Sequence, residues 1–274
     1  LVHKVHGAAH HHTTWGAAQT LCGTFAQGRQ KGGDDVLTTV SIDGYGPTAQ
    51  NADSQVVSDA LTSLTLANSK NGLGVWNGAA EILALSLNNI GTGSTINLDA
   101  GGAVYTTLNI TTTGTASHVS LTAAAVKTLT VAGTKTLDLT GATLTALETV
   151  TVSGSAGLTI NASGANVTAV STAATTGDST ITVNADKATF TGGDGKDAVT
   201  LSSTTVDKAV SLAGGDDSLT LAAGTTAVSS TLSGGLGTDT LVMDAADADT
   251  LSGSTAFGAK IDGFEKLSIG EAAA

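Results

Sequence analysis

Short segments in which aliphatic residues alternate with Thr, Ser or Asn recur along almost the whole chain, about one every ten residues. They include Leu64/Leu66, Leu108/Ile110, Leu129/Val131, Val150/Val152 and Leu219/Leu221. A period of two is typical of a β-strand with one buried and one solvent-facing side. Gly, Ser, Asn and Asp, the residues that favour turns, fill the intervals. The pattern therefore predicts many short strands connected by tight turns.

Strands at this spacing occur both in sandwiches of antiparallel hairpins and in solenoids. Three features favour a solenoid: the segments are short, their inward positions are nearly all Leu, Val or Ile, and only 3% of the residues are aromatic. A sandwich core about 10 Å thick needs larger side chains to fill it. We therefore predict an all-β protein, a parallel β-solenoid (β-helix or β-roll) with two strands in each coil of about 20 residues.

The alternation divides the chain into four predicted regions. An exposed solenoid end carries unpaired backbone groups, so the last region should act as a cap, unless a partner covers the end. Within it, 243–260 is expected to form a short helix or irregular segment and 264–269 a last strand. The regions are an irregular N-terminal segment (1–31), a Thr/Ala-rich solenoid (32–190), coils with Gly- and Asp-rich loops (191–242) and a small C-terminal cap (243–274).

The charge and the cysteine content of the chain limit the classes of partner and cross-link that can be expected. The net charge is −12 and only 11 of the 274 residues are Lys or Arg, which argues against nucleic acid and anionic membranes and favours cations. The chain contains no run of about 18 apolar residues, so no membrane-spanning segment is predicted. Cys22 is the only cysteine, so neither an intrachain disulfide nor a cysteine-based zinc site is expected. A secreted protein without disulfides needs another kind of cross-link, and we expect a metal ion to provide it.

Three segments match, or nearly match, the calcium-binding repeat G-G-x-G-x-D-x-U, where U is aliphatic. Residues 192–199 and 234–241 match completely, whereas 212–219 lacks the first two glycines of the pattern. Their aspartates, Asp197, Asp217 and Asp239, are 20 and 22 residues apart, which is one coil each. We therefore expect these aspartates to stack on one edge of the solenoid.

The composition of these loops suits calcium, so we predict that the coils at 191–242 bind it. Ca²⁺ takes six to eight oxygen ligands, and a tight loop can turn its carbonyl groups inward only at backbone angles that Gly adopts at low cost. Without the ion, the aspartates would repel one another, so folding of this region should depend on calcium. The predicted calcium-site residues are Gly193, Asp194, Gly195, Asp197, Gly215, Asp216, Asp217, Gly235, Gly237 and Asp239, with Asp34 and Asp35 in the similar segment 32–37 as a weaker candidate.

Residues 188–270, and the Thr/Ala-rich repeats before them, resemble the C-terminal region of bacterial RTX-type surface proteins of the S-layer kind. The resemblance implies type I export without an N-terminal signal, calcium-driven folding outside the cell, and assembly into a lattice or another surface polymer. The sequence from Leu1 shows no Sec-type signal, so a signal was either removed or replaced by such a route. Coils of about 20 residues depart from the nine-residue tandem repeat of that family, which leaves the number of calcium sites open.

Other chemistries receive less support. His3, His6, His10, His11 and His12 offer imidazole ligands for zinc, copper or nickel, but their spacing is irregular. Ladders of outward threonines could bind ice, although Asp, Asn and Lys interrupt them. An enzyme is not expected, because the chain has a single arginine, Arg29, and no nucleophile motif such as G-x-S-x-G.

These observations predict a secreted structural protein of the bacterial surface that self-assembles in the presence of Ca²⁺ into an S-layer, filament or coat. The alternative is a calcium-dependent adhesin or carbohydrate-binding module that binds a cell-surface glycan without polymerising.

Overall fold

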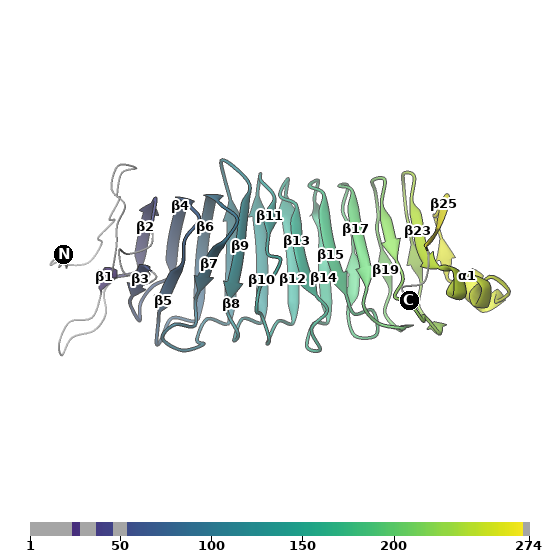
Figure 1. Ribbon diagram of the computed structural model, residues 1–274, viewed down its shortest axis with the longest axis horizontal. Coiled ribbons are helices and arrows are strands. Elements are labelled where there is room, and N and C mark those ends of the chain that lie inside the picture. The colour runs from purple at the N-terminus through teal and green to yellow at the C-terminus, as the bar shows by residue number, and fades with distance from the viewer. Residues whose placement is uncertain (1–23, 28–36, 46–53, 271–274) are drawn as a thin grey trace. The chain divides into compact units, whose positions relative to one another are not determined.

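The computed structural model describes residues 24–27, 37–45 and 54–270 (Figure 1). Asp34, Asp35 and the five N-terminal histidines lie outside these residues, so their predicted roles stay predictions. The chain divides into two compact units, Leu1–Leu147 and Glu148–Ala274. The region boundaries predicted at 32, 191 and 243 also stay predictions.

Strands of the first unit alternate between two sheets, and each strand pairs in parallel with the strand two places further along the chain. Two strands therefore make one coil. One sheet contains β1 (Thr24–Gln27), β3 (Ser54–Val57), β5 (Leu73–Trp76), β7 (Ser94–Asn97), β9 (Ser117–Thr122) and β11 (Leu137–Asp138). The other contains β2 (Thr39–Asp43), β4 (Ser63–Ser69), β6 (Ile82–Ile90), β8 (Thr107–Thr112) and β10 (Thr128–Gly133).

The second unit has the same construction. One sheet contains β13 (Leu158–Ala162), β15 (Ser179–Val183), β17 (Asp197–Leu201), β20 (Ser218–Thr220), β23 (Thr240–Asp244) and β25 (Lys266–Gly270). The other contains β12 (Thr149–Gly154), β14 (Ala169–Thr175), β16 (Thr189–Thr191), β19 (Val210–Ser211), β22 (Leu232–Ser233) and β24 (Ile261–Asp262). A small third pair joins β18 (Thr205–Val206) to β21 (Ala227–Val228).

The predicted parallel β-solenoid is confirmed, and the sandwich of antiparallel hairpins is wrong for the described residues. Coil length follows from the residues that pair between strands: Leu108 pairs with Leu129, 21 residues later, and Val199 pairs with Leu219, 20 residues later. Figure 1 shows the strands of each unit lying side by side in this order.

The core of each unit is a column of aliphatic side chains, because in-register parallel pairing places equivalent residues of successive coils on the same face. In the first unit, the pairings connect Val40, Leu64, Leu85, Ile110 and Val131, and each is at most 3% exposed. The Thr, Ser and Asn residues between them point outward. The alternating residues of the sequence thus separate into a buried aliphatic face and an outward polar face.

One edge of the first unit carries an asparagine ladder that the sequence patterns did not reveal. Asn68 and Asn89 adopt left-handed backbone angles, with φ of 52° and 55°. Asn tolerates this conformation better than most residues. The Asn89 side-chain amide donates to Asn68 Oδ1 at 2.8 Å, and that of Asn68 donates to Asp43 Oδ1 at 2.7 Å. These bonds connect the turns of successive coils.

The C-terminal region contains the expected helical segment and last strand. α1 (Ala245–Ser252) and α2 (Thr255–Gly258) connect β23 to β24, and β25 overlaps the predicted strand 264–269. Asp244 caps α1 by accepting the Asp247 N–H at 2.7 Å, and Ser254 caps α2 by accepting the Phe257 N–H at 3.2 Å. Neither helix of the described chain has the length and hydropathy needed to cross a membrane.

Candidate metal site

A five-residue unit recurs at the start of the strands that form one sheet of the second unit. It reads Gly, any residue, an acid, any residue, and an aliphatic residue, as in Gly195–Val199, Gly215–Leu219 and Gly237–Leu241. The aliphatic residues are at most 5% exposed and belong to the core column. They anchor each loop, so the acids of successive coils lie at the same position, as expected from their spacing.

We call Asp197, Asp217 and Asp239 the aspartate ladder. Hydrogen bonds from the backbone N–H of one aspartate to the side chain of the next connect its members. The Asp197 N–H donates to Asp217 Oδ1 at 2.7 Å, and the Asp217 N–H donates to Asp239 Oδ1 at 2.9 Å. The side chains of Asp217 and Asp239 therefore each satisfy the backbone N–H of the ladder aspartate in the preceding coil. This accounts for one carboxylate oxygen of Asp217 and one of Asp239.

The remaining oxygens of the ladder have no protein partner. The three side chains are only 1%, 2% and 0% exposed, and Oδ1 of Asp197, Oδ2 of Asp217 and Oδ2 of Asp239 are buried without a hydrogen bond. The other oxygen of Asp197 accepts from Thr172 Oγ1 at 2.8 Å. A buried carboxylate oxygen without a partner costs several kcal/mol in a charged group, so each of these atoms calls for a proton or a cation.

Burial and nearby negative charges disfavour the ionised form of the ladder aspartates and raise their pKa values. Burial raises the pKa of Asp217 from 3.8 to about 7, assisted by the negative charges of Asp197, Asp239 and Asp216. Burial also raises the pKa of Asp197 and of Asp239, and the charges of Glu265 and Asp216 add to the effect at Asp239. A cation placed beside the unpartnered oxygens reverses this effect, because it stabilises the charged form.

Glycines make room for the backbone oxygens beside the ladder. A Cβ at Gly195 would lie 2.5 Å from the Gly177 carbonyl oxygen, and one at Gly215 would lie 2.7 Å from that of Gly195. A Cβ at Gly237 would collide with the Gly215 carbonyl oxygen. Gly215 and Gly237 also have φ values of 130° and 131°, which disfavour any residue with a side chain. The close stacking of these loops therefore requires glycine.

The loop at 212–219, which lacks the first two glycines of the repeat, adopts a similar backbone conformation with strain at one residue. Ala213 occupies the position of Gly235 in the next coil and has a φ of 72°. A Cβ at Gly235 would collide with the Ala213 carbonyl oxygen, so the two loops are stacked closely. A left-handed Ala is strained by about 1–2 kcal/mol, and the surrounding loops hold it there.

The other predicted aspartates point elsewhere. Asp194 and Asp216 are exposed, and Asp216 Oδ1 accepts the Thr238 N–H of the next coil at 2.9 Å. Asp178 behaves in the same way with the Lys196 N–H, also at 2.9 Å. Asp194 and Asp216 therefore lie at the solvent side of the loops, and the buried, unpartnered oxygens belong to the aspartate ladder alone among the predicted ligands of the described residues.

Two members of this edge were not predicted. Thr172 bonds to Asp197 from the other sheet, and Glu265 continues the ladder, because its Oε2 accepts the Asp239 N–H at 2.7 Å. Gly263–Leu267 repeats the Gly-x-acid-x-aliphatic unit with Glu in place of Asp. The signal was therefore in the sequence, but the insertion of α1 and α2 lengthened the step to 26 residues and hid it.

The arrangement limits the kind of metal site that the edge can form. Within the described ranges, no three His, Cys, Asp or Glu side chains converge on one point. A metal at the ladder would therefore take one or two carboxylate oxygens together with backbone carbonyl oxygens. Such an all-oxygen set fits Ca²⁺ and does not fit the nitrogen and sulfur sites typical of zinc.

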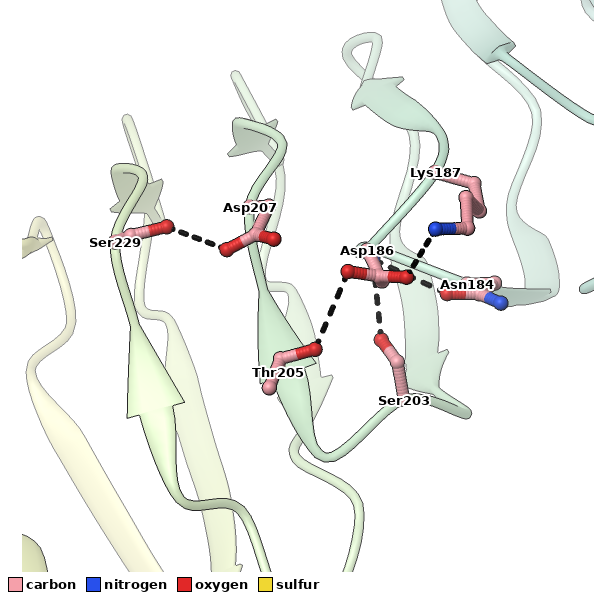
Figure 2. Close-up of polar contacts among 7 residues, drawn as sticks. All are labelled: Asn184, Asp186, Lys187, Ser203, Thr205, Asp207 and Ser229. Atoms are coloured by element: carbon pink, nitrogen blue, oxygen red, sulfur yellow. Dashed lines mark hydrogen bonds and ion pairs between the residues drawn. The ribbon is translucent and has the colours of Figure 1, made fainter.

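Carboxylates that follow β15 and β18 provide a contrast (Figure 2). Asp186 follows β15 and accepts from Thr205 Oγ1 at 3.3 Å, while Lys187 Nζ lies 2.6 Å from its other oxygen. Hydrogen bonding to Lys187 lowers the pKa of Asp186. Asp207 accepts from Ser229 Oγ at 2.7 Å. These acids are partnered and half-buried or exposed, so they need no cation.

Comparisons of the chain with protein-family models, with curated proteins and with solved structures find no match. What the chain does is therefore inferred from the chemistry of its own residues.

Proposed function

We propose that this chain is a structural protein of the bacterial cell surface or extracellular space, of the RTX type, which folds around Ca²⁺ and self-associates into an S-layer, filament or coat. The observation that carries the proposal is the aspartate ladder, in which three successive coils each bury one carboxylate oxygen without a partner. Export by a type I system is part of the proposal, since folding around calcium is then delayed until the chain is outside the cell.

Calcium is the proposed ion because every available ligand is oxygen. Asp197, Asp217 and Asp239 would hold it, together with carbonyl oxygens of the glycine loops. The bound ion would supply charge compensation to carboxylates whose burial raises their pKa. Each ion would also connect neighbouring coils, so that part of its binding free energy becomes folding free energy.

Two features of the chain, its net charge and its small surface side chains, support the proposed self-association. The outward positions of the strands carry mainly small Thr, Ser and Asn side chains, which repeat from coil to coil. The net charge of −12 opposes the approach of a second copy, and bound Ca²⁺ reduces that repulsion. Assembly is therefore expected to need calcium for a second reason besides folding.

Calorimetric titration of Ca²⁺ into the calcium-free chain tests the first half of the proposal, with far-ultraviolet circular dichroism recorded on the same samples. We expect calcium uptake and an increased β-signal. Both should be weakened in the double variant Asp197→Asn/Asp217→Asn. Asp178→Asn is the matched control, because Asp178 also accepts a backbone N–H from a neighbouring coil but is exposed. Equal uptake by the double variant and the control contradicts the assigned ligands.

Electron microscopy of the chain in millimolar Ca²⁺ tests the second half. We expect lattices or fibres that disappear when a chelator is added. Particles that stay monomeric with calcium bound would contradict self-assembly and leave the calcium sites intact.

A calcium-dependent adhesin or carbohydrate-binding module is the second candidate. Trp76, at the end of β5, is 43% exposed, and an exposed indole is a common platform for sugar rings. Glycan-array binding by a monomeric chain that is lost in Trp76→Ala would favour this candidate over assembly.

A further inference from the structure

The buried polar side chains of the coils just before the aspartate ladder are neutral and have partners within the chain. Thr175 in β14 is 3% exposed, and its Oγ1 donates to the Ala156 carbonyl oxygen at 2.6 Å. Ser179, which pairs with Asp197 of the next coil, is 2% exposed and carries a hydroxyl where the ladder carries a carboxylate. Among the described residues, no carboxylate before Asp197 is buried. These coils therefore need no cation to complete their interior.

The density of charge changes at the same point of the chain. Residues 149–191 contain two acids and one lysine, whereas 192–265 contain eleven acids and three lysines. Without a cation, the repulsion among carboxylates is thus concentrated in the coils from 192 onward. Both the buried carboxylates and most of the repulsion begin where the glycine loops begin.

A hydrogen bond between the two sheets joins the two kinds of coil. Thr172 in β14 is fully buried, and its Oγ1 donates to Asp197 Oδ2 at 2.8 Å. The same Oγ1 lies 3.5 Å from the Thr191 carbonyl oxygen. A hydroxyl has only one proton, and a charged acceptor at the shorter distance is the stronger partner. The bond holds one carboxylate oxygen of Asp197 and leaves Oδ1 without a partner.

A bulge in β14 brings more of this strand against the ladder. The pairing of β14 with β12 shifts register after Ser171, where β14 has one residue more than its neighbour. The extra residue allows Thr172 and Thr175, three positions apart, both to be buried. A Cβ at Gly193 would lie 2.3 Å from the Thr172 carbonyl oxygen and 2.4 Å from that of Thr175. The backbone of β14 therefore packs closely against the loop at 192–196.

We infer that β14 and the turn after it form a calcium-independent template for the aspartate ladder, in which Thr172 is a positioning residue that holds the Asp197 carboxylate for the ion. The coils up to β16 then stay folded without Ca²⁺, and those from 192 onward order on them when the ion binds. Each coil contacts its neighbours, so the first ordered coil provides the surface for the next. The inference rests on the proposed calcium function and adds where calcium-dependent folding begins.

Hydrogen exchange measured by mass spectrometry, with and without a chelator, tests the template. Peptides covering β13 and β15 should keep their protection when Ca²⁺ is removed, whereas peptides covering β17 and β20 should lose it. Retained protection at β17 and β20, or equal loss in both sets of peptides, overturns the template if calcium uptake is normal. Absent calcium uptake by the unmodified chain would instead contradict the proposed calcium function, and the inference with it.

Substitutions at Thr172 test its positioning role. Thr172→Val keeps the shape of the side chain and removes the hydroxyl, so the calcium dissociation constant should rise about tenfold. Thr172→Ser retains the hydroxyl and should restore the native value to within about threefold. Thr189→Val, at an exposed position of β16, is the matched control and should leave the dissociation constant unchanged.

A second readout separates positioning from general support of the coil. In calcium-free buffer, peptides covering β13 and β15 should be equally protected in Thr172→Val and in the native chain, whereas a merely structural role would reduce their protection. A native dissociation constant in Thr172→Val, or a loss of protection in those peptides, overturns the positioning role.

Discussion

Replacing Asp217 with Asn is expected to have opposite effects with and without calcium. Without it, Asp217 is a buried carboxylate whose pKa is raised from 3.8 to about 7 by burial and neighbouring charges. At pH 8 the side chain is ionised in both the native and the unfolded state. The shift then represents a native-state penalty of up to about 4 kcal/mol, at about 1.4 kcal/mol for each pKa unit.

The Asn variant removes that charge and retains the ladder bond. Its amide oxygen can still accept the Asp197 N–H, which lies 2.7 Å from Oδ1 in the native chain. Its amide nitrogen takes the place of the unpartnered oxygen and remains unsatisfied, at a cost of about 1–3 kcal/mol. In calcium-free buffer at pH 8, Asp217→Asn should therefore stabilise the C-terminal unit by about 1–3 kcal/mol.

With millimolar Ca²⁺, the native chain should instead be more stable than the Asp217→Asn variant. The native chain gains the free energy of ion binding, while the variant has lost a charged ligand, and each tenfold loss of affinity removes about 1.4 kcal/mol of that gain. Hydrogen exchange measured by mass spectrometry on peptides covering β17 and β20 reports local stability. It is preferable to tryptophan fluorescence, because Trp15 and Trp76 both lie in the other unit.

Asp178→Asn is the control for this experiment, since it alters an exposed carboxylate with the same kind of backbone bond. It should change neither state by more than about 0.5 kcal/mol. If Asp217→Asn instead destabilises the calcium-free chain and leaves the calcium-induced gain unchanged, Asp217 is a structural hydrogen-bond acceptor and the cation site is refuted.

Three further outcomes follow from the same edge. Ala213→Gly should stabilise the chain by about 1 kcal/mol in urea unfolding, because it relieves a φ of 72°, and a loss of stability would show that the loop is unstrained. Gly237→Ala should cost at least about 2–3 kcal/mol, because its Cβ would collide with the Gly215 carbonyl oxygen, whereas Gly253→Ala, which meets nothing within 4 Å, should be nearly neutral. In calcium-free buffer the unfolding free energy should fall as the pH rises from about 4 to 7, since native Asp217 keeps a proton that the unfolded chain has released, and a flat profile would contradict the raised pKa.

Local pattern alone was sufficient to predict the architecture. A period of two with aliphatic inner positions specifies strands with one buried side, and loops such as 192–197 and 234–239 specify tight, glycine-dependent turns at intervals of one coil. In a solenoid each coil contacts its neighbours, so this short-range information also determines which residues stack. The parallel pairing of Val199 with Leu219, and of Leu219 with Leu241, follows from it.

Only the tertiary structure decided which atoms of these loops are available to a ligand. Asp216 and Asp217 are adjacent in the sequence, yet one is exposed and the other is 2% exposed with an unpartnered oxygen. Glu265 joins the ladder. The reason is that these properties depend on hydrogen bonds and cover from residues 20 to 26 positions away, across turns of variable length. Sequence spacing locates a coil, but only packing against the next coil determines what each carboxylate and each aliphatic side chain contacts.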